Sequence, residues 1–196
     1  IDQSKYCKPL HDLVPLRNKL VKRTVLNTVE SLIGPIKGVN THSILGYVHK
    51  PYPPIYATLA DQAGFSSSLL IRGVEGGVVP SLRQKGMMVS YYKGVEKNRV
   101  NIDPKEIGIN RELRAISFPK EFEGFKNRDS LAMYISELGQ SALSGKAGMF
   151  YDGLVYSASL ILWHIDRKKT LLAASEKVRA ALDSSNALDR IKDKQS

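Results

Sequence analysis

The sequence contains very little cysteine: Cys7 is the only one in 196 residues. One cysteine excludes an internal disulfide framework and a cysteine-based zinc site. The chain also has no apolar run of membrane-spanning length, and its first residues lack the basic-then-apolar layout of a signal peptide. We therefore expect a protein of a reducing compartment, the cytoplasm, with no membrane partner.

Metal-ligating and nucleophilic patterns are equally scarce. The four histidines have no metal-ligand spacing, and His42 and His49 stand seven residues apart at either end of one expected strand. The serines at 66–68 and Ser157 carry no nucleophile-elbow pattern. The sequence alone therefore assigns no catalytic residue, and we expect the histidines to be surface or half-buried side chains.

Positive charge is what the chain has in excess. Its 29 lysines and arginines against 19 acidic residues give a net charge of +10. Such a balance favours anionic partners, either phosphorylated small molecules or nucleic acid, and a merely soluble basic surface is the alternative. The charge is spread in short clusters, so only folding can bring them onto one surface. The clusters are Lys19, Lys22 and Arg23; Arg83 and Lys85; Lys93, Lys97 and Arg99; and Arg167, Lys168 and Lys169.

The length fits one domain with a substantial core, which we place at residues 1–196. The chain begins at Ile1 and not at a methionine, which suggests a C-terminal fragment. Apolar residues at helical spacing over 10–36 predict two helices, the second from about Thr24. Helical spacing returns over 130–143, 150–165 and 170–181, with a last helix from Ser184 or Ser185.

The middle of the chain alternates strands and a helix. We expect strands at 43–48 and 67–71 with a helix at 55–63 between them. This βαβ unit predicts parallel pairing through a right-handed crossover. Shorter β segments at 87–92 and 99–102 suggest a hairpin about Lys93-Gly94. The expected fold class is α/β, with a mostly parallel sheet flanked by helices.

The most informative segment is the turn that follows the apolar run 68–71. In it Arg72 and Glu75 accompany three glycines, Gly73, Gly76 and Gly77. Buried strands of α/β proteins deliver their carboxyl ends to binding crevices, where glycine allows a tight turn or close approach of a ligand. The N–H groups of Gly76-Gly77 either face a phosphate or close a simple turn. We predict substrate-binding residues here: Arg72, Gly73, Glu75 and Gly76.

Several segments, in the right order, together resemble the anthranilate phosphoribosyltransferase-like family of glycosyl transferases. Residues 14–27 resemble its P-x-R-x-x-L-G-x-R-T-x-x-N signature, and Pro35 follows at the expected place. Residues 102–108 resemble its P-E-D-x-G turn, and residues 173–188 resemble its closing A-I-D-S-G-K-A-L helix. The resemblance spans nearly the whole chain.

This resemblance implies the catalytic α/β domain of the nucleoside phosphorylase/phosphoribosyltransferase type, without the N-terminal helical domain through which family members form homodimers. It implies transfer of a phosphoribosyl group from phosphoribosyl pyrophosphate to an aromatic or nitrogenous acceptor, as in tryptophan biosynthesis, with Mg²⁺. Arg17 stands at the family's acceptor-binding arginine, and a guanidinium can pair bidentately with a carboxylate. A surface or interhelix salt bridge is the alternative for Arg17.

Two family motifs are absent. The G-T-G-G-D phosphate loop is not in the chain, and we expect it upstream of Ile1. In the H-G-x-G-x-D-E strand end, Arg72 replaces the histidine and Gly77-Val78-Val79 stands where an acid pair should hold magnesium. Magnesium needs oxygen ligands. Glu75 is the one remaining candidate ligand, and an ion pair with Arg72 is its alternative role.

The segment Arg72-Gly73-x-Glu75-Gly76 is instead similar to a divergent branch of the family that keeps the fold, lacks the anthranilate activity and includes a DNA-binding protein. Two hypotheses follow. In the first, an enzyme, Arg17 binds the acceptor, Arg72 faces the donor phosphates and Glu75 supports Arg72 or a metal. The second is a catalytically silent module that binds nucleic acid without reading its sequence. Its phosphate contacts would be Lys19, Lys22, Arg23, Arg72, Arg83 and Lys85.

Overall fold

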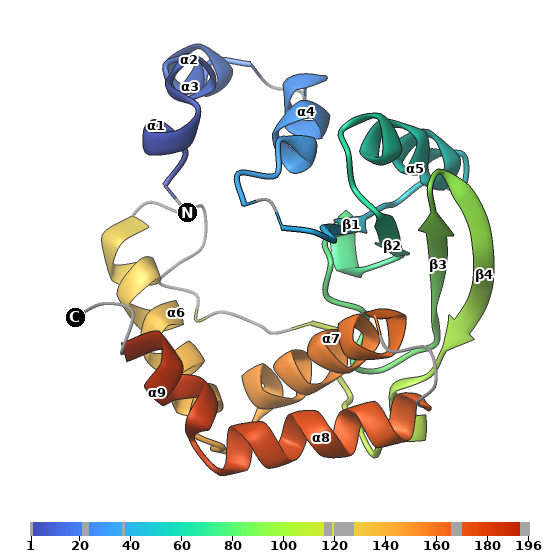
Figure 1. Ribbon diagram of the computed structural model, residues 1–196. Helices are drawn as coiled ribbons and strands as arrows, with labels where there is room; N and C mark the ends of the chain where they lie inside the picture. Colours follow the sequence, from blue (N-terminus) through green and yellow to red (C-terminus); the bar gives the residue numbers. More distant parts are fainter. Residues whose placement is uncertain are drawn as a thin grey trace.

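The computed structural model describes residues 2–20, 24–36, 38–115, 119, 128–165 and 170–192. It confirms the α/β class: a four-stranded sheet in the order β1-β2-β3-β4 lies between helices (Figure 1). Strand β1 (His42–Gly46), helix α5 (Tyr52–Gln62) and strand β2 (Ser67–Ile71) form the predicted βαβ unit. The two strands pair in parallel, with His42 opposite Ser67 and Gly46 opposite Ile71.

The other half of the sheet is antiparallel, so the sheet is mixed and not mostly parallel. Strand β3 (Gly86–Tyr92) runs against β2, and β4 (Val95–Ile102) runs against β3. The reason lies in the connections, because a parallel return needs a long crossover. Between β3 and β4 stand only Lys93 and Gly94, with φ of 46° and 70°. Two positive φ values are the mark of a tight hairpin turn, as predicted at this position.

Helices cover both faces of the sheet. On one face, helix α7 (Met149–Ile165) packs with Val155 and Leu160 against Leu69 and Ile71 of β2. On the other, α5 packs with Ala57 and Ala60 against Leu70 of β2 and neighbouring strand residues. Every residue of β2 is therefore buried, which fits the three consecutive apolar residues at 69–71. Helix α7 is central, and eight of its residues are buried.

Further helices complete the α7 side of the molecule (Figure 1). They are α6 (Arg128–Leu143), α8 (Leu171–Asp183) and α9 (Asn186–Lys192), each within about two residues of its predicted start. A single 3₁₀ turn, η2 (Pro104–Ile107), begins at the capping Asp103 and ends at Gly108, whose φ is 75°. Thr170 caps α8 by accepting a hydrogen bond from Ala173 N–H.

The N-terminal region differs most from its prediction. In place of the first predicted helix it forms three short ones, α1 (Gln3–Tyr6), α2 (Lys8–His11) and α3 (Val14–Arg17), whereas the second, predicted from about Thr24, is confirmed as α4 (Leu26–Leu32). Pro9 and Pro15 stand in the first turns of α2 and α3, where proline starts a helix and cannot continue the one before. Helices α1 to α3 lie apart from the sheet (Figure 1). No helix of the described residues is long and apolar enough to cross a membrane.

Candidate functional site

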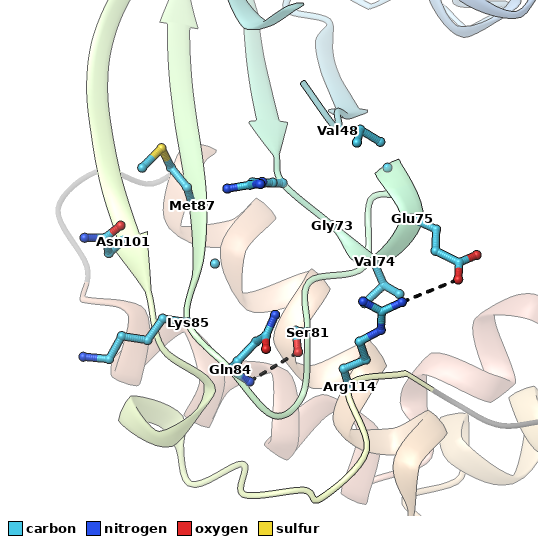
Figure 2. A pocket seen from close by; sticks show the side chains of 13 residues that line it. Val48, Gly73, Val74, Glu75, Ser81, Gln84, Lys85, Met87, Asn101 and Arg114 are labelled. Atoms are coloured by element: carbon cyan, nitrogen blue, oxygen red, sulfur yellow. Dashed lines mark hydrogen bonds and ion pairs between the residues drawn. The ribbon is translucent and has the colours of Figure 1, made fainter. Parts of the chain in front are cut away.

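A pocket of about 480 Å³ opens beyond the carboxyl end of β2. Its wall combines Val48, which follows β1, with the turn after β2 and the segment that leads into β3. Asn101 of β4 and Arg114 complete it (Figure 2). The residues of the turn are Arg72, Gly73, Val74, Glu75 and Gly76, and those of the β3 side are Ser81, Gln84, Lys85, Gly86 and Met87. The predicted turn therefore does line a pocket.

The backbone of this turn is tightly closed. A 3₁₀ turn, η1 (Val74–Gly76), carries Glu75 at φ 53° and Gly76 at φ 80°, both left-handed. The N–H of Gly76 donates to Gly73 O at 3.3 Å, and the N–H of Gly77 donates to Val74 O at 2.9 Å. These two N–H groups are occupied within the turn. Of the two predicted roles for Gly76-Gly77, the simple tight turn is the one observed, and the phosphate-facing nest is not.

Gly73 is required by the same geometry. A Cβ atom at this position would lie 1.9 Å from Gly77 O. Because Gly77 O is a backbone atom, it cannot move aside to relieve the clash without displacing the turn. The N–H of Val74 also donates to Val79 O at 3.0 Å, which folds residues 77–79 back over the turn. Gly73 thus shapes the pocket wall, and the side chains around it must supply the contacts with a ligand.

The charged side chains among them are mostly cationic. Arg72, Lys85 and Arg114 line the pocket, and Glu75 is the one carboxylate among the lining residues. An Arg114 Nη2 lies 3.7 Å from Glu75 Oε1, and both side chains are more than half exposed, at 58% and 81%. Figure 2 shows the two pointing toward one another. Glu75 therefore pairs with Arg114 and not, as the sequence suggested, with Arg72.

The other two cations are differently placed. Lys85 Nζ lies 3.6 Å from Asp103 Oδ2, a long contact for a lysine that is 74% exposed. Arg72 has no ion pair within 4 Å among the described residues, while its backbone N–H donates to Met87 O at 2.8 Å. That bond fixes the backbone of Arg72 at the end of the sheet. Its side chain remains available to an anionic ligand.

Arg114 reaches the pocket through a chain of contacts that the sequence did not reveal. Arg111 Nε donates to Asp152 Oδ2 of α7 at 2.5 Å, and Asp152 is buried. On the same segment, Leu82 N–H donates to Arg114 O at 3.1 Å. Helix α7 therefore anchors the irregular segment that carries Arg114. The sequence gives no signal for it, because Arg114 belongs to no motif.

The structure does not bring Arg17 to this pocket. Arg17 lies at the end of α3, where its guanidinium forms an ion pair with Glu30 of α4. Gln3 Nε2 also donates to Glu30 Oε1 at 2.8 Å. The Gln3 hydrogen bond, and then Arg17, lower the pKa of the Glu30 carboxyl. The interhelix salt bridge, one of the two alternatives for Arg17, is thus what the structure contains.

Of the four described basic residues in the nucleic-acid hypothesis, two line the pocket. Arg72 and Lys85 line the pocket, whereas the exposed Arg83 does not. Lys19 is exposed beyond α3, and Lys22 and Arg23 lie outside the described residues. Two of the six predicted phosphate contacts therefore share one site.

The pocket does not fit a magnesium ion. No group of three or more histidine, cysteine, aspartate or glutamate side chains suited to a metal occurs among the described residues. Glu75 is paired with Arg114, Asp103 with Lys85, and Val78 and Val79 offer no oxygen ligand. Mg²⁺ demands octahedral oxygen coordination, usually from one or two carboxylates together with water and phosphate. The described lining residues thus offer one carboxylate, Glu75, and the nearby Asp103 lies outside the lining.

A second polar cluster lies at the amino ends of β1 and β2. Ser67 Oγ lies 2.6 Å from His42 Nδ1 and 2.8 Å from His164 Nε2. Tyr92 Oη donates to His164 O at 3.1 Å. Ser67 and His164 are buried. The cluster joins β1, β2, β3 and α7, and residues 97 positions apart form it, which is why sequence spacing could not predict it.

Comparisons with known proteins agree with this architecture. The model of the family described as "Glycosyl transferase family, a/b domain" matches residues 1–188. A protein of Aquifex aeolicus, named as uncharacterized, is 28% identical over 165 residues, which are 83% of this chain and 48% of that protein. The anthranilate phosphoribosyltransferase of Thiobacillus denitrificans is 24% identical over 178 residues, or 90% of this chain and 48% of that enzyme.

Solved structures of the anthranilate phosphoribosyltransferase from Saccharomyces cerevisiae have the same fold. The complex with PRPP and Mg superposes with a TM-score of 0.69 at 22% identity, over 94% of this chain and 48% of that one. The complex with 4-fluoroanthranilate gives a TM-score of 0.70 at 20% identity, over 94% and 50%. This chain thus spans about half the length of the relatives that it matches.

Proposed function

The chain belongs to the glycosyl transferase family, a/b domain, and from this we propose that its pocket binds the pyrophosphate part of phosphoribosyl pyrophosphate. The whole protein would transfer the phosphoribosyl group to an aromatic or nitrogenous acceptor. The observation that carries the proposal is the cationic pocket at the carboxyl end of β2, where Arg72, Lys85 and Arg114 face one cavity. A pocket at this edge of an α/β sheet is where such folds bind ligands.

The chemistry of transfer needs little from this half of the protein beyond charge and position. When the bond between the sugar and pyrophosphate breaks, positive charge develops on the sugar and negative charge on the departing pyrophosphate. Fixed cations that face the leaving oxygens stabilise that state. Guanidinium groups suit the task because their planar N–H pairs match phosphate geometry. Arg72 and Arg114 would hold the departing pyrophosphate, and Lys85 would add a point charge.

The acceptor role of Arg17 is part of the proposal. An acceptor carboxylate would take the place of Glu30 on the Arg17 guanidinium, as a competing anion of the same chemistry. One solved yeast structure is a complex with PRPP and Mg, and another is a complex with 4-fluoroanthranilate. Since the described residues do not fit a magnesium site, any Mg²⁺ in the reaction would be carried by the phosphates of the ligand and would not be needed for the cations to bind them.

The experiment is calorimetric titration of the protein with phosphoribosyl pyrophosphate, with and without Mg²⁺. We expect saturable binding, and at least about tenfold weaker binding by Arg72→Gln, since hydrogen bonds to a charged group contribute roughly 1.5–3 kcal/mol. Arg83→Gln is the matched control, because it removes the same charge from an exposed residue outside the pocket. Its affinity should stay within about twofold of wild type.

Titration with a mixed-sequence DNA duplex separates the second hypothesis. Binding to DNA that falls steeply with salt, together with no binding of phosphoribosyl pyrophosphate, would contradict the proposal and favour the nucleic-acid module. Equal losses in Arg72→Gln and Arg83→Gln would show a diffuse effect of charge and would also contradict it. Formation of a homodimer through an N-terminal helical domain stays a prediction from the resemblance.

A further inference from the structure

Among the described residues that line the pocket, the one carboxylate faces one of the three cations. Glu75 Oε1 lies 3.7 Å from Arg114 Nη2, at the edge of a cavity also lined by Arg72 and Lys85. We propose that Glu75 competes with the ligand for Arg114: a pyrophosphate group displaces the Glu75 carboxylate from Arg114 and binds the three cations directly, without a divalent metal. This inference rests on the proposed function, because it names how the same pocket takes its ligand.

The geometry of the pair suits displacement. At 3.7 Å the charged atoms are beyond hydrogen-bond distance, so the contact has none of the short bidentate geometry that makes Arg–carboxylate pairs strong. Both side chains are largely exposed, and exposed pairs contribute little to stability. Glu75 can therefore turn outward into solvent without uncovering any buried group. The pair keeps Arg114 near the pocket without holding it firmly.

A pyrophosphate offers the pocket more than Glu75 does. It presents several charged oxygens at once, whereas the carboxylate reaches one of three cations. Those cations come from three separate segments: Arg72 follows β2, Lys85 precedes β3, and Arg114 lies on the segment anchored by α7. One ligand that spans all three gains from each contact. With Glu75 in place, the four charged lining residues still carry a net charge of +2, from three cations and one carboxylate.

The backbone supports a role for the Glu75 side chain. Its φ of 53° and ψ of 26° place it in the left-handed region, which favours glycine, asparagine and aspartate. A glutamate gains nothing from that conformation, so the local turn alone does not explain the residue. What the side chain contacts is Arg114. The turn's N–H groups at Gly76 and Gly77 are already bonded, so ligand charge must be met by side chains.

The alternative role for Glu75, as a magnesium ligand, makes the opposite prediction. If Glu75 competes with the ligand, its removal strengthens binding of pyrophosphate. If Glu75 holds Mg²⁺, its removal weakens binding, and only when Mg²⁺ is present. The sign of one affinity change therefore separates the two roles. Val78 and Val79, both exposed beside the turn, supply no second carboxylate for a metal.

The test is titration of the protein with inorganic pyrophosphate in EDTA and in Mg²⁺. We expect wild type to bind in EDTA, and Glu75→Gln to bind about two- to fivefold more tightly, as removal of a weak exposed pair predicts. Arg114→Gln should bind at least about tenfold more weakly. The double variant should match Arg114→Gln, because without Arg114 the competitor has nothing to occupy.

Glu112→Gln is the matched control, since Glu112 is exposed, stands close to Arg114 in sequence and does not line the pocket. A gain in Glu75→Gln no larger than in Glu112→Gln would overturn the inference, as would binding that requires Mg²⁺ and is weakened in Glu75→Gln. In both cases the proposed function would stand, because pyrophosphate still binds. Absence of pyrophosphate binding in either buffer would instead defeat the proposed function itself.

Discussion

A Cβ atom on Gly46 would lie 2.2 Å from the carbonyl oxygen of Gly76 and 2.4 Å from that of Gly77. Gly46 is the last residue of β1, and Gly76 belongs to the turn that follows β2. The backbone at the end of β1 thus packs directly on the backbone of the turn after β2, and no side chain fits between the end of β1 and this turn. This contact holds the turn that presents Arg72 and Glu75 to the pocket.

Gly46→Ala is therefore expected to displace the turn. Because the atoms in the way are backbone carbonyls, relief requires movement of the turn itself, and we expect pyrophosphate affinity to fall by about tenfold or more, with a loss of roughly 1–3 kcal/mol in the free energy of unfolding. Urea denaturation and calorimetry measure the two effects. Gly139→Ala is the control: nothing lies within 4 Å of its Cβ position, and a helical Gly→Ala change should stabilise by about 0.5–1 kcal/mol.

Arg111→Met should both destabilise the protein and weaken the pocket. The change leaves the buried Asp152 carboxylate without the partner that now lies at 2.5 Å, which costs about 1–3 kcal/mol or more. It also frees the segment that carries Arg114, so pyrophosphate affinity should fall too. Arg114→Gln should lower affinity with unchanged stability. If Arg111→Met left affinity at the wild-type value, the anchoring of Arg114 by α7 would be disproved.

Tyr156→Phe is expected to stabilise the protein. The side chain is fully buried in the core, and its hydroxyl has no hydrogen-bond partner in the part of the chain that the structure describes. Burial raises the pKa of this hydroxyl. Removing an unsatisfied buried group should raise the free energy of unfolding by about 1 kcal/mol. Tyr151→Phe is the paired measurement: Tyr151 Oη donates to Asp183 Oδ1 at 2.7 Å, so its removal should have the opposite sign.

Tyr91→Phe should flatten the loss of stability at alkaline pH. Burial, reinforced by the hydrogen bond to Glu96, raises the pKa of Tyr91 from 10.0 to about 12. The unfolded chain loses this proton near pH 10, whereas the folded protein keeps it to about pH 12. Its contribution is therefore complete below pH 10 and is lost as pH rises to 12. Across that window, the slope of unfolding free energy against pH should shrink by at most about 1.4 kcal/mol per unit.

The measurement is a series of denaturant titrations from pH 9 to pH 12 on both proteins. Tyr52→Phe serves as the comparison, because Tyr52 is an exposed tyrosine at the start of α5. An equal flattening in Tyr52→Phe would mean that the effect does not come from the buried Tyr91 hydroxyl.

The sequence by itself determined the family, the class of fold and most elements. The apolar run at 67–71 predicted β2 at its observed bounds, and Lys93-Gly94 predicted the hairpin. The segment 102–108, which resembles a family turn, does form one, η2, which ends at Gly108. These predictions succeed because periodicity and turn chemistry are local properties, written in adjacent residues. The turn after β2 also lies beside a pocket, as expected of a strand followed by glycines, and its binding of a substrate stays a prediction.

Only the tertiary structure decided which side chains meet. It paired Glu75 with Arg114 instead of Arg72, and Arg17 with Glu30 instead of the pocket. It also turned β3 antiparallel, because the chain returns from β2 without a crossover helix. The distance between Glu75 and Arg114 depends on how α7 packs, and the distance between Arg17 and Glu30 depends on where α4 lies. No pattern of neighbouring residues encodes such a distance, which depends on how several elements pack at once.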